Sequence, residues 1–342
     1  MREYLRKLAA GEYLSEEEAE AAMHLLMRGE ARPEEVAAFL MGLRTRGEHI
    51  DELTAFTRVM RAYAVPVTLP DPDAIDLCGT GGDSSGTFNI STAAAFVCAG
   101  AGVTVAKHGN RSISSRSGSA DVLEALGIQV NLGREGVEYC LEHSGIAFLF
   151  APHFHPAMRH VMPVRRLLGV RTFFNILGPL VNPAGVERQL VGAFSEEVAE
   201  TMAQILARLG ARRAVTVHGA GLDEVSLSAP TTLYEVEEGA FRGRRMWEPE
   251  RLGMQRTAVA SLQGGDAGEN ARILLDVLSG TPGPQRDVVL LNAAWALWTS
   301  GKFPRIEEAY KAAVESIDSG AALRKVEALR TYSQKAPVSS NP

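Results

Sequence analysis

Apolar residues recur at intervals of three and four along the first 65 residues, a pattern that predicts helices with one buried face each. Ser15 and Glu18 fit a capping box at the start of a helix that continues through AAMHLLMRGE (21–30). Pro33 can open the next helix and Gly47 can end it, and residues 50–64 form a third. No strand pattern occurs here. The sequence therefore predicts a helical N-terminal unit over residues 1–65.

The pattern changes after a Pro-rich connector that starts at residue 66. Short apolar runs then alternate with helical stretches, which is typical of βαβ units and a mostly parallel sheet. The expected strands and helices of this part are AIDLC (74–78), STAAAFVCAGAG (91–102), VTVAKHG (103–109), SADVLEALG (119–127), IQVNL (128–132), GVEYCLEHSG (136–145) and IAFLFAP (146–152). The fold class is therefore α/β, with a small helical domain beside a larger one.

Later segments extend this picture. Residues 153–184 return to helical periodicity, and strand–helix alternation resumes at 188–194. Residues 225–260 alternate between apolar and polar positions and contain turns, which predicts an antiparallel extension. The chain ends in helices, and we expect residues 333–342 to be disordered.

Composition narrows the function classes. A chain of 342 residues is long for one core, so two domains are expected. The net charge of −6 argues against non-specific binding of nucleic acid. Residues 1–11 are too polar for a signal peptide, and no apolar run is long enough to span a membrane. The three cysteines lack metal-type spacing and read as reduced, buried thiols, so the protein is expected in the cytoplasm.

A glycine-rich stretch, DLCGTGGDSSGTFNIST (76–92), follows the first expected strand and leads into a helix. Gly79, Gly81 and Gly82 would let backbone N–H groups approach a ligand closely. The start of the next helix favours an anion, most simply a phosphate. The spacing fits neither the dinucleotide fingerprint nor the P-loop. The alternative is an ordinary tight turn with helix-capping residues.

A second polar stretch, KHGNRSISSRSGSADVLEALG (107–127), also lies between a strand and a helix. Both stretches would meet at the carboxyl ends of parallel strands, where ligands bind. Lys107 and Arg111 supply charge. The neutral donors are Asn110, Ser112, Ser114, Ser115 and Ser119. Two such loops on one sheet edge would suit a ligand with two phosphate groups.

Adjacent acids follow a further expected strand at the same edge. Asp223 and Glu224 would be ordinary surface acids elsewhere, but beside phosphate loops they suit Mg²⁺, which is commonly shared between carboxylates and substrate phosphates. The Ser91 hydroxyl could add one more oxygen ligand.

Arg165 and Arg166 interrupt an apolar helical pattern. One is expected to reach solvent and the other to face a cleft, where a guanidinium suits a carboxylate; two surface arginines are the alternative. His153 and His155 lack a third metal ligand nearby.

Six motifs, in this order, resemble the anthranilate phosphoribosyltransferase family, and the resemblance covers nearly the whole chain. They are GTGGD (79–83), FNIST (88–92), KHGNR (107–111), PVRR (163–166), RTFFNILGPLVNP (171–183) and DE (223–224). The resemblance implies transfer of the phosphoribosyl group of phosphoribosyl pyrophosphate (PRPP) to the amine of anthranilate, releasing pyrophosphate, in L-tryptophan biosynthesis. It also implies Mg²⁺, two ions per subunit, and a homodimer through the helical domain, with no nucleic-acid or membrane partner.

The same resemblance implies the domain plan. Residues 153–184 complete the helical domain of 1–65, hinges join it to an α/β domain of 74–152 and 185–335 with a mostly parallel central sheet, and 336–342 form a tail.

Motif by motif, the resemblance also implies three groups of site residues. The PRPP site would comprise Gly79, Gly82, Asp83, Thr87, Asn89, Ile90, Ser91, Thr92, Lys107, His108, Gly109, Asn110, Arg111, Ser112, Ile113, Ser114, Ser115 and Ser119. The anthranilate site would comprise Gly79, Asn110 and Arg165, with His108 as a wall, and the metal site Ser91, Asp223 and Glu224. We assign no general base, because an aromatic amine needs little deprotonation before attack.

Two alternatives remain at this point. A pyrimidine nucleoside phosphorylase shares the implied fold, but its K-x-S-G-R pattern differs from KHGNR in this chain. A non-catalytic relative that binds nucleic acid would need a basic face, which the acidic net charge disfavours.

Overall fold

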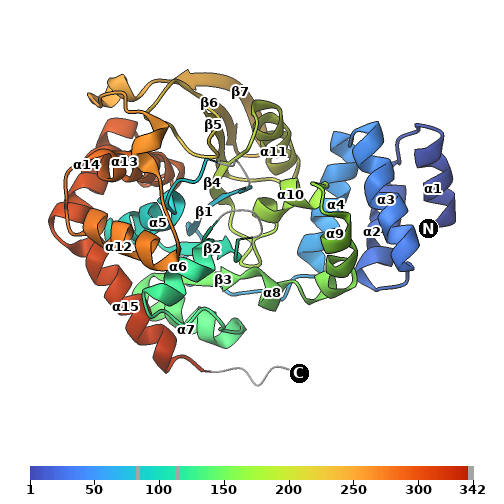
Figure 1. Ribbon diagram of the computed structural model, residues 1–342, viewed down its shortest axis with the longest axis horizontal. Helices are drawn as coiled ribbons and strands as arrows, with labels where there is room; N and C mark the ends of the chain where they lie inside the picture. The colour runs from blue at the N-terminus through green and yellow to red at the C-terminus, as the bar shows by residue number, and fades with distance from the viewer. Residues whose placement is uncertain (82–84, 113–115, 338–342) are drawn as a thin grey trace.

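The computed structural model describes residues 1–81, 85–112 and 116–337. Four helices form the N-terminal part at one end of the molecule (Figure 1). The Ser15 side chain accepts from Glu18 N and the Glu18 side chain from Ser15 N, which confirms the capping box of the second helix. Pro33 opens the third helix and Gly47 follows its end, as predicted. The four helices are α1 (Arg2–Ala9), α2 (Glu16–Met27), α3 (Pro33–Arg46) and α4 (Ile50–Ala62).

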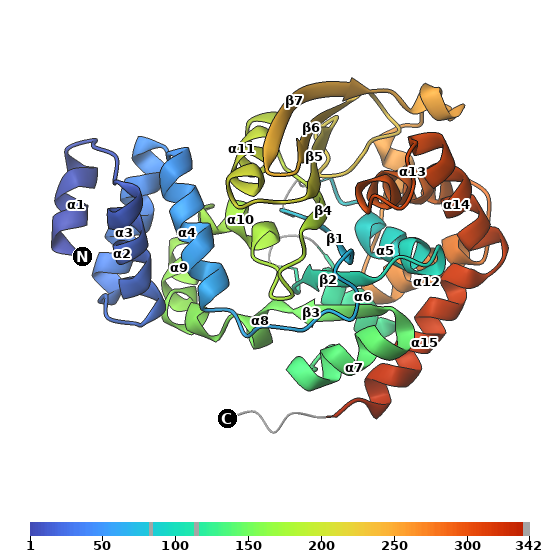
Figure 2. The same cartoon turned by 180° about the vertical axis from the view of Figure 1, so that it is seen from behind.

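A later segment returns to this helical part. Val164 and Phe173 share an apolar core with Phe39 and Phe56, and the rings of Phe56 and Phe173 stack with centroids 4.7 Å apart. Both views place α9 beside the N-terminal helices (Figures 1 and 2). The short helices of the segment are α8 (Ala151–Phe154), η1 (Pro156–His160), α9 (Met162–Leu168), α10 (Phe174–Leu177) and η2 (Gly178–Leu180).

A seven-stranded sheet forms the centre of the larger part, in the order β3-β2-β1-β4-β5-β6-β7. The first five strands of this order are parallel, and β6 and β7 add to β5 in antiparallel fashion. The mostly parallel sheet and its antiparallel extension are therefore confirmed. The strands are β1 (Ile75–Gly79), β2 (Val105–Gly109), β3 (Ile146–Phe150), β4 (Arg188–Gly192), β5 (Arg213–Gly219), β6 (Thr231–Glu237) and β7 (Ala240–Trp247).

Helices cover both faces of the sheet and divide the apolar residues into two cores. One core includes Met202 of α11 and Tyr234 of β6, and it continues into the helical part. The other joins the sheet to the remaining helices and contains Phe96 and Trp295. The covering helices are α5 (Ile90–Gly100), α6 (Ser119–Ala125), α7 (Arg134–Ser144), α11 (Glu196–Arg208), α12 (Ala267–Leu278), α13 (Pro284–Thr299), α14 (Ile306–Asp318) and α15 (Ala321–Lys335), with the short turns η3 (Pro249–Leu252) and η4 (Val259–Leu262).

Two predictions near α15 are wrong. Residues 128–132 were expected to be a strand, but they pair with no strand in the described part of the chain. The Gln129 N–H donates to Ser333 Oγ of α15 at 3.0 Å, so a helix rather than a sheet neighbour holds this segment. Residues 333–342 were expected to be disordered, yet α15 continues through Lys335. Residues 338–342 lie outside the described residues.

The predicted state of the cysteines is confirmed, since Cys78, Cys98 and Cys140 are free and buried. Burial raises the pKa of all three thiols, that of Cys140 to about 12. Within the described residues, no helix combines the length and apolar character that a membrane span requires.

Candidate active site

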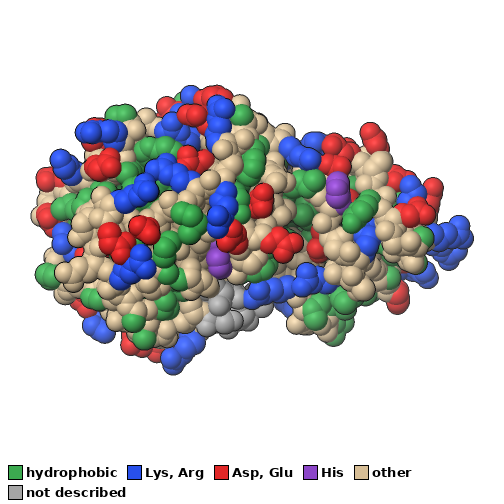
Figure 3. Space-filling view, turned by 90° about the horizontal axis from the view of Figure 1, so that it is seen from above, with side chains coloured by type: hydrophobic (Ala, Val, Ile, Leu, Met, Phe, Trp, Pro, Cys, Tyr) green, Lys and Arg blue, Asp and Glu red, His purple; other side chains and the backbone are tan. Residues whose placement is uncertain are grey.

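A cleft of about 670 Å³ opens at the carboxyl ends of β1 and β2. Its walls come from both polar stretches, from the acids after β5 and from α9 of the returning helical segment. In the space-filling view, Lys and Arg side chains lie along the narrow part between the two lobes (Figure 3). The cleft therefore brings together segments that are more than 100 residues apart in the chain.

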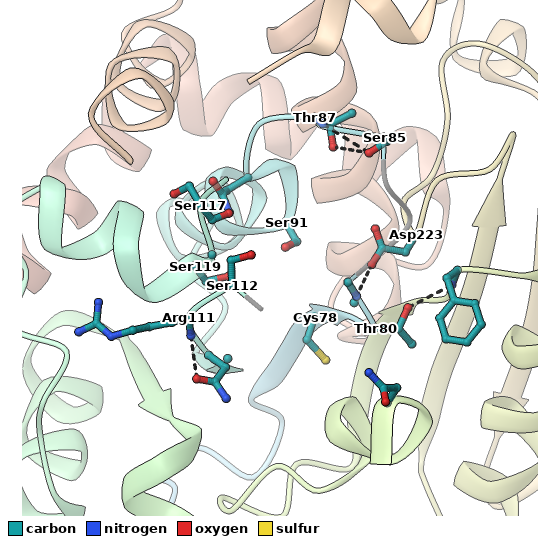
Figure 4. A pocket seen from close by; sticks show the side chains of 18 of the residues that line it. Cys78, Thr80, Ser85, Thr87, Ser91, Arg111, Ser112, Ser117, Ser119 and Asp223 are labelled. Carbon is teal, nitrogen blue, oxygen red and sulfur yellow. Dashed lines mark hydrogen bonds between the residues drawn. The ribbon is translucent and has the colours of Figure 1, made fainter. Parts of the chain in front are cut away.

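The Asp223 loop lies directly on the glycines at the strand ends. Asp223 Oδ2 accepts from Gly81 N at 2.7 Å (Figure 4). A Cβ atom on Gly79 would lie 2.5 Å from Asp223 Oδ2, and one on Gly192 would lie 1.6 Å from Asp223 O. Glycine is required at both positions because the loop approaches this closely. The first polar stretch and the acid pair thus form one unit.

The second half of the first stretch is held by η4 and α12. Phe88 N donates to Leu262 O at 3.1 Å. Asn270, which is buried, donates to Asn89 Oδ1 at 3.0 Å. The hydroxyl groups of Ser85 and Thr87 lie 3.2 Å apart (Figure 4). The predicted Thr87 and Asn89 are therefore fixed at the rim of the cleft.

The first turn of α5 contacts an acid of the chain itself. Ser91 N donates to Glu224 Oε1 at 3.2 Å, so this carboxylate uses one of the N–H groups that the sequence assigned to a phosphate. Ile90 and Ser91 line the cleft. Thr92 is buried and does not line it, although the family motif placed Thr92 in the PRPP site.

Two cations of the second stretch, Lys107 and Arg111, have different partners. Lys107 is 3% exposed, and its ammonium donates to Leu77 O and to Ser91 Oγ, the latter at 3.3 Å. Arg111 instead forms ion pairs with Asp121 and Glu124 of α6, and these hydrogen bonds raise its pKa. Its guanidinium points away from Ser91 and Asp223 in Figure 4. The described conformation therefore brings the Lys107 ammonium to Ser91, whereas Arg111 lines the cleft with its guanidinium paired to α6.

The other predicted residues of the two stretches divide into two sets. Those that line the cleft are His108, Gly109, Asn110, Ser112 and Ser119. Gly82, Asp83, Ile113, Ser114 and Ser115 lie outside the described residues.

Asn292 of α13 binds the backbone that follows the acid pair. Val225 N donates to Asn292 Oδ1, and Asn292 Nδ2 donates to Val225 O, both at 2.9 Å. Asn292 lies on α13 and is 1% exposed. This two-point contact fixes the chain one residue after Glu224.

The donor set suits a hard cation that keeps other ligands. Asp223, Glu224 and Ser91 offer only oxygen atoms, which Mg²⁺ prefers. Across the described residues, no three or more His, Cys, Asp or Glu side chains form a group that could hold a metal ion. This oxygen-only donor set fits Mg²⁺.

Arg165 supplies the cation on the opposite wall. Its guanidinium lies 4.9 Å from the centroid of the Phe174 ring, and burial lowers its pKa to about 10. Among the described residues, no carboxylate forms an ion pair with Arg165, and its guanidinium donates to Met162 Sδ at 3.5 Å. Arg166 also lines the cleft but is exposed. Arg166 thus reaches solvent, as expected of one of the pair, but both arginines line the cleft.

An uncharged histidine pair lies beside the cleft, which His108 lines. The rings of His108 and His155 lie 5.2 Å apart, and burial lowers their pKa values to about 3 and about 4. Both imidazoles are therefore neutral at physiological pH, and His108 presents an uncharged wall to the cleft.

Several functional candidates were missed in the sequence. Asn175 lies within a quoted motif but received no role, although it lines the cleft together with Met162 and Phe194. Asp76 is fully buried beneath the cleft, and a charged residue inside the apolar run AIDLC was the signal for it.

The chain matches two family models that together cover most of its length. Residues 2–64 match the helical bundle domain of a glycosyl transferase family, and residues 71–323 match the a/b domain of the same family. The anthranilate phosphoribosyltransferase of Salinibacter ruber is 58% identical over 98% of this chain and 99% of that protein.

Solved structures agree with these matches. The crystal structure of anthranilate phosphoribosyltransferase from Thermus thermophilus has a TM-score of 0.91 and 44% identity, covering 96% of this chain and 99% of that one. The Saccharomyces cerevisiae enzyme in complex with PRPP and Mg has a TM-score of 0.89 and 30% identity, covering 97% of each chain. Another structure of the yeast enzyme, with 4-fluoroanthranilate, has a TM-score of 0.86 and 29% identity, again covering 97% of each chain.

Proposed function

The chain belongs to the anthranilate phosphoribosyltransferase family, and we propose that its cleft holds PRPP on the strand-end loops and anthranilate against Arg165. The enzyme transfers the phosphoribosyl group of PRPP to the amine of anthranilate. One observation supports the proposed arrangement. Two polar loops and an acid pair meet on one wall of the cleft. The opposite wall carries Arg165, which has no carboxylate partner among the described residues.

PRPP suits the loop side because it carries a phosphate and a pyrophosphate. The Lys107 ammonium donates to Ser91 Oγ, and the amide and hydroxyl groups of Asn89, Thr87 and Ser119 offer neutral donors. Two anionic groups on one ligand match two donor-rich loops. The yeast enzyme with bound PRPP supports this assignment.

Anthranilate suits the side of the cleft formed by Arg165. Its carboxylate would meet the Arg165 guanidinium, and neutral His108 and Asn110 would border its ring. The yeast structure with 4-fluoroanthranilate supports a site for this class of ligand.

Displacement at the ribose C1 atom builds positive charge on the sugar as pyrophosphate leaves. The chain contributes mainly by holding the amine and the sugar in the same cleft and by stabilising the charge of the leaving group. Mg²⁺, when bound, would offset that charge. Asp223, Glu224 and Ser91 would hold it, and we propose two ions per subunit, shared with the pyrophosphate oxygens. Mg in the yeast PRPP complex supports the choice of metal.

We also propose that residues 1–65 and 153–184 form one domain and residues 74–152 and 185–335 the other. The core shared by Phe56 and Phe173 supports the first grouping. A homodimer through the helical domain is proposed because the family resemblance implies it. Light scattering should then give twice the chain mass of 36.8 kDa. Three buried free thiols support a reducing, cytoplasmic location.

The nucleoside phosphorylase and the nucleic-acid-binding protein are set aside, because relatives that match nearly the whole chain are anthranilate phosphoribosyltransferases. The direct test follows anthranilate fluorescence with protein, PRPP and Mg²⁺, together with pyrophosphate release. We expect one pyrophosphate for each anthranilate consumed, and no reaction when PRPP is omitted. Phosphorolysis of a pyrimidine nucleoside without anthranilate turnover would contradict the proposal.

A further inference from the structure

Strands β1 and β2 separate at their carboxyl ends, directly beneath the cleft. β1 registers with β4 along its whole length, but with β2 only at Ile75↔Val105. In a parallel ladder, the next β1 residue to bond to β2 would be Leu77, which would donate to Ala106 O and accept from His108 N. The registered pairing ends before that point.

Side chains satisfy most of the backbone groups that the interrupted ladder leaves. The two missing ladder bonds involve four backbone groups, and Ala106 O, Leu77 O and His108 N each have a side-chain partner. With the donor first, these bonds are Asn182 Nδ2 to Ala106 O at 2.8 Å, Lys107 Nζ to Leu77 O, and His108 N to Asp76 Oδ1 at 3.1 Å. A missing ladder bond between buried strands would otherwise leave polar groups unsatisfied, which is rare in folded proteins.

Two of these side chains also bond to each other. Asn182 Nδ2 donates to Asp76 Oδ2 at 2.8 Å, and Asn182 Oδ1 accepts from Ala184 N at 2.9 Å. Asp76 is 0% exposed and Asn182 is 4% exposed. We call this pair the Asp76–Asn182 wedge, because it occupies the space between β1 and β2 where the strands part.

The wedge connects three parts of the site. Asn182 lies where the chain returns from the helical segment to β4, within the quoted motif RTFFNILGPLVNP. Asp76 lies on β1, which leads into the first polar stretch, and it accepts from the backbone of β2, which leads into the second. Lys107 lies beside Asp76 and reaches Ser91 across the gap between the strands.

We propose that Asp76 and Asn182 are positioning residues for phosphoribosyl transfer. The wedge sets the separation of the two polar loops and directs the Lys107 ammonium toward Ser91. Neither wedge residue lines the cleft, so each acts through its neighbours and not by touching substrate. This inference rests on the proposed function, because it takes Lys107 and Ser91 as parts of the PRPP site.

Exchanging the amide and the carboxylate between positions 76 and 182 provides the test. Asp76→Asn places an amide against the Asn182 amide, and Asn182→Asp places two carboxylates together. The double variant Asp76→Asn/Asn182→Asp again pairs an amide with a carboxylate. We expect each single change to raise the KM for PRPP by about 10- to 100-fold, the cost typical of disturbed supporting contacts, with a smaller effect on kcat. The double variant restores the bond between the two side chains but leaves Ala106 O without its donor, so it should recover part of the KM for PRPP that either single change loses.

A buried hydroxyl elsewhere in the sheet provides the matched control. Thr216 on β5 is 0% exposed and donates to Ala199 O at 2.6 Å. Thr216→Val removes a buried hydrogen bond far from the wedge, so it should lower the thermal stability without changing the KM for PRPP. If both single wedge variants lose stability but keep the wild-type KM for PRPP, the wedge is purely structural and the proposal is wrong.

Two further variants keep the outcomes distinct. If Asp76→Asn does not fold, Asn182→Ala replaces it, and an unchanged KM for PRPP in that variant overturns the proposal equally. Lys107→Met tests the underlying assignment. If Lys107→Met changes the KM for PRPP but the Asp76 and Asn182 variants do not, only the wedge proposal is wrong. A silent Lys107→Met variant overturns the PRPP assignment of Lys107, and the wedge proposal with it.

Discussion

Arg165→Ala is expected to weaken anthranilate binding and to leave PRPP binding largely intact. The guanidinium lies on α9, stacked over Phe174, without a carboxylate partner among the described residues. A carboxylate ligand would give it the charge-assisted hydrogen bonds that it lacks, each pair worth about 1.5–3 kcal/mol. That free energy corresponds to a rise of about 12- to 150-fold in the KM for anthranilate.

Burial places the expected value in the upper half of this range. The pKa of Arg165 falls to about 10 because the folded protein partly desolvates the guanidinium. Part of the cost of removing the cation from water is therefore already met on folding, and little of it remains to oppose binding. A fully exposed arginine would pay that cost when the ligand arrives.

The assay is steady-state fluorescence of anthranilate, with each substrate varied at saturating concentration of the other. Arg159→Ala is the control, because Arg159 is an exposed arginine on η1 of the same segment. It should change either KM by less than about threefold, as surface substitutions usually do. The reasoning is refuted if Arg165→Ala keeps the wild-type KM for anthranilate and loses affinity for PRPP.

The remaining predictions concern the loop side of the cleft. Lys107→Ala should raise chiefly the KM for PRPP and Asn110→Ala chiefly that for anthranilate; identical kinetic changes would mean that the stretch serves one ligand. Asp223→Asn/Glu224→Gln should lower activity steeply at low Mg²⁺ and recover partly at high Mg²⁺, whereas an unchanged Mg²⁺ dependence would remove the metal site. Asn292→Ala, which frees the Val225 backbone, should shift the Mg²⁺ dependence in the same direction, and calorimetric titration of PRPP with Mg²⁺ should show weaker binding. Burial raises the pKa of Asp76 to about 6, above its unfolded value, so its contribution to stability is full below about pH 4 and is lost as pH rises through about 6. In Asp76→Asn, the free energy of unfolding measured with urea should change less between about pH 4 and pH 6 than in the wild type. If the variant and the wild type show the same pH dependence there, Asp76 does not titrate in this range.

Periodicity and motif order were enough to predict the fold class and most of the cleft. The strand–helix alternation after residue 74 gave the parallel sheet, because each apolar run is long enough for a buried strand and too short for a helix. Residues 128–132 have the same apolar alternation, yet the partner that satisfies Gln129 is Ser333 of α15, and no local pattern encodes that contact.

The supporting residues of the site were harder to predict for the same reason. Asn182, Asn270 and Asn292 read as loop or helix residues in the sequence, but each is buried and bonds to a different part of the cleft. Their roles depend on contacts between segments up to about 180 residues apart, as in the bond between Asn270 and Asn89. Arg111 shows the reverse case, because its neighbours in α6 offer two carboxylates that the basic motif did not suggest.

A crystal structure of the protein with PRPP, Mg²⁺ and 4-fluoroanthranilate tests the central claim most directly. The account predicts the phosphate groups of PRPP on the stretches 79–92 and 107–119, Mg²⁺ on Asp223 and Glu224, and the carboxylate of the analogue on Arg165. An analogue carboxylate bound among the strand-end loops, or PRPP phosphates bound to Arg165, would contradict the assignment of the two sides of the cleft.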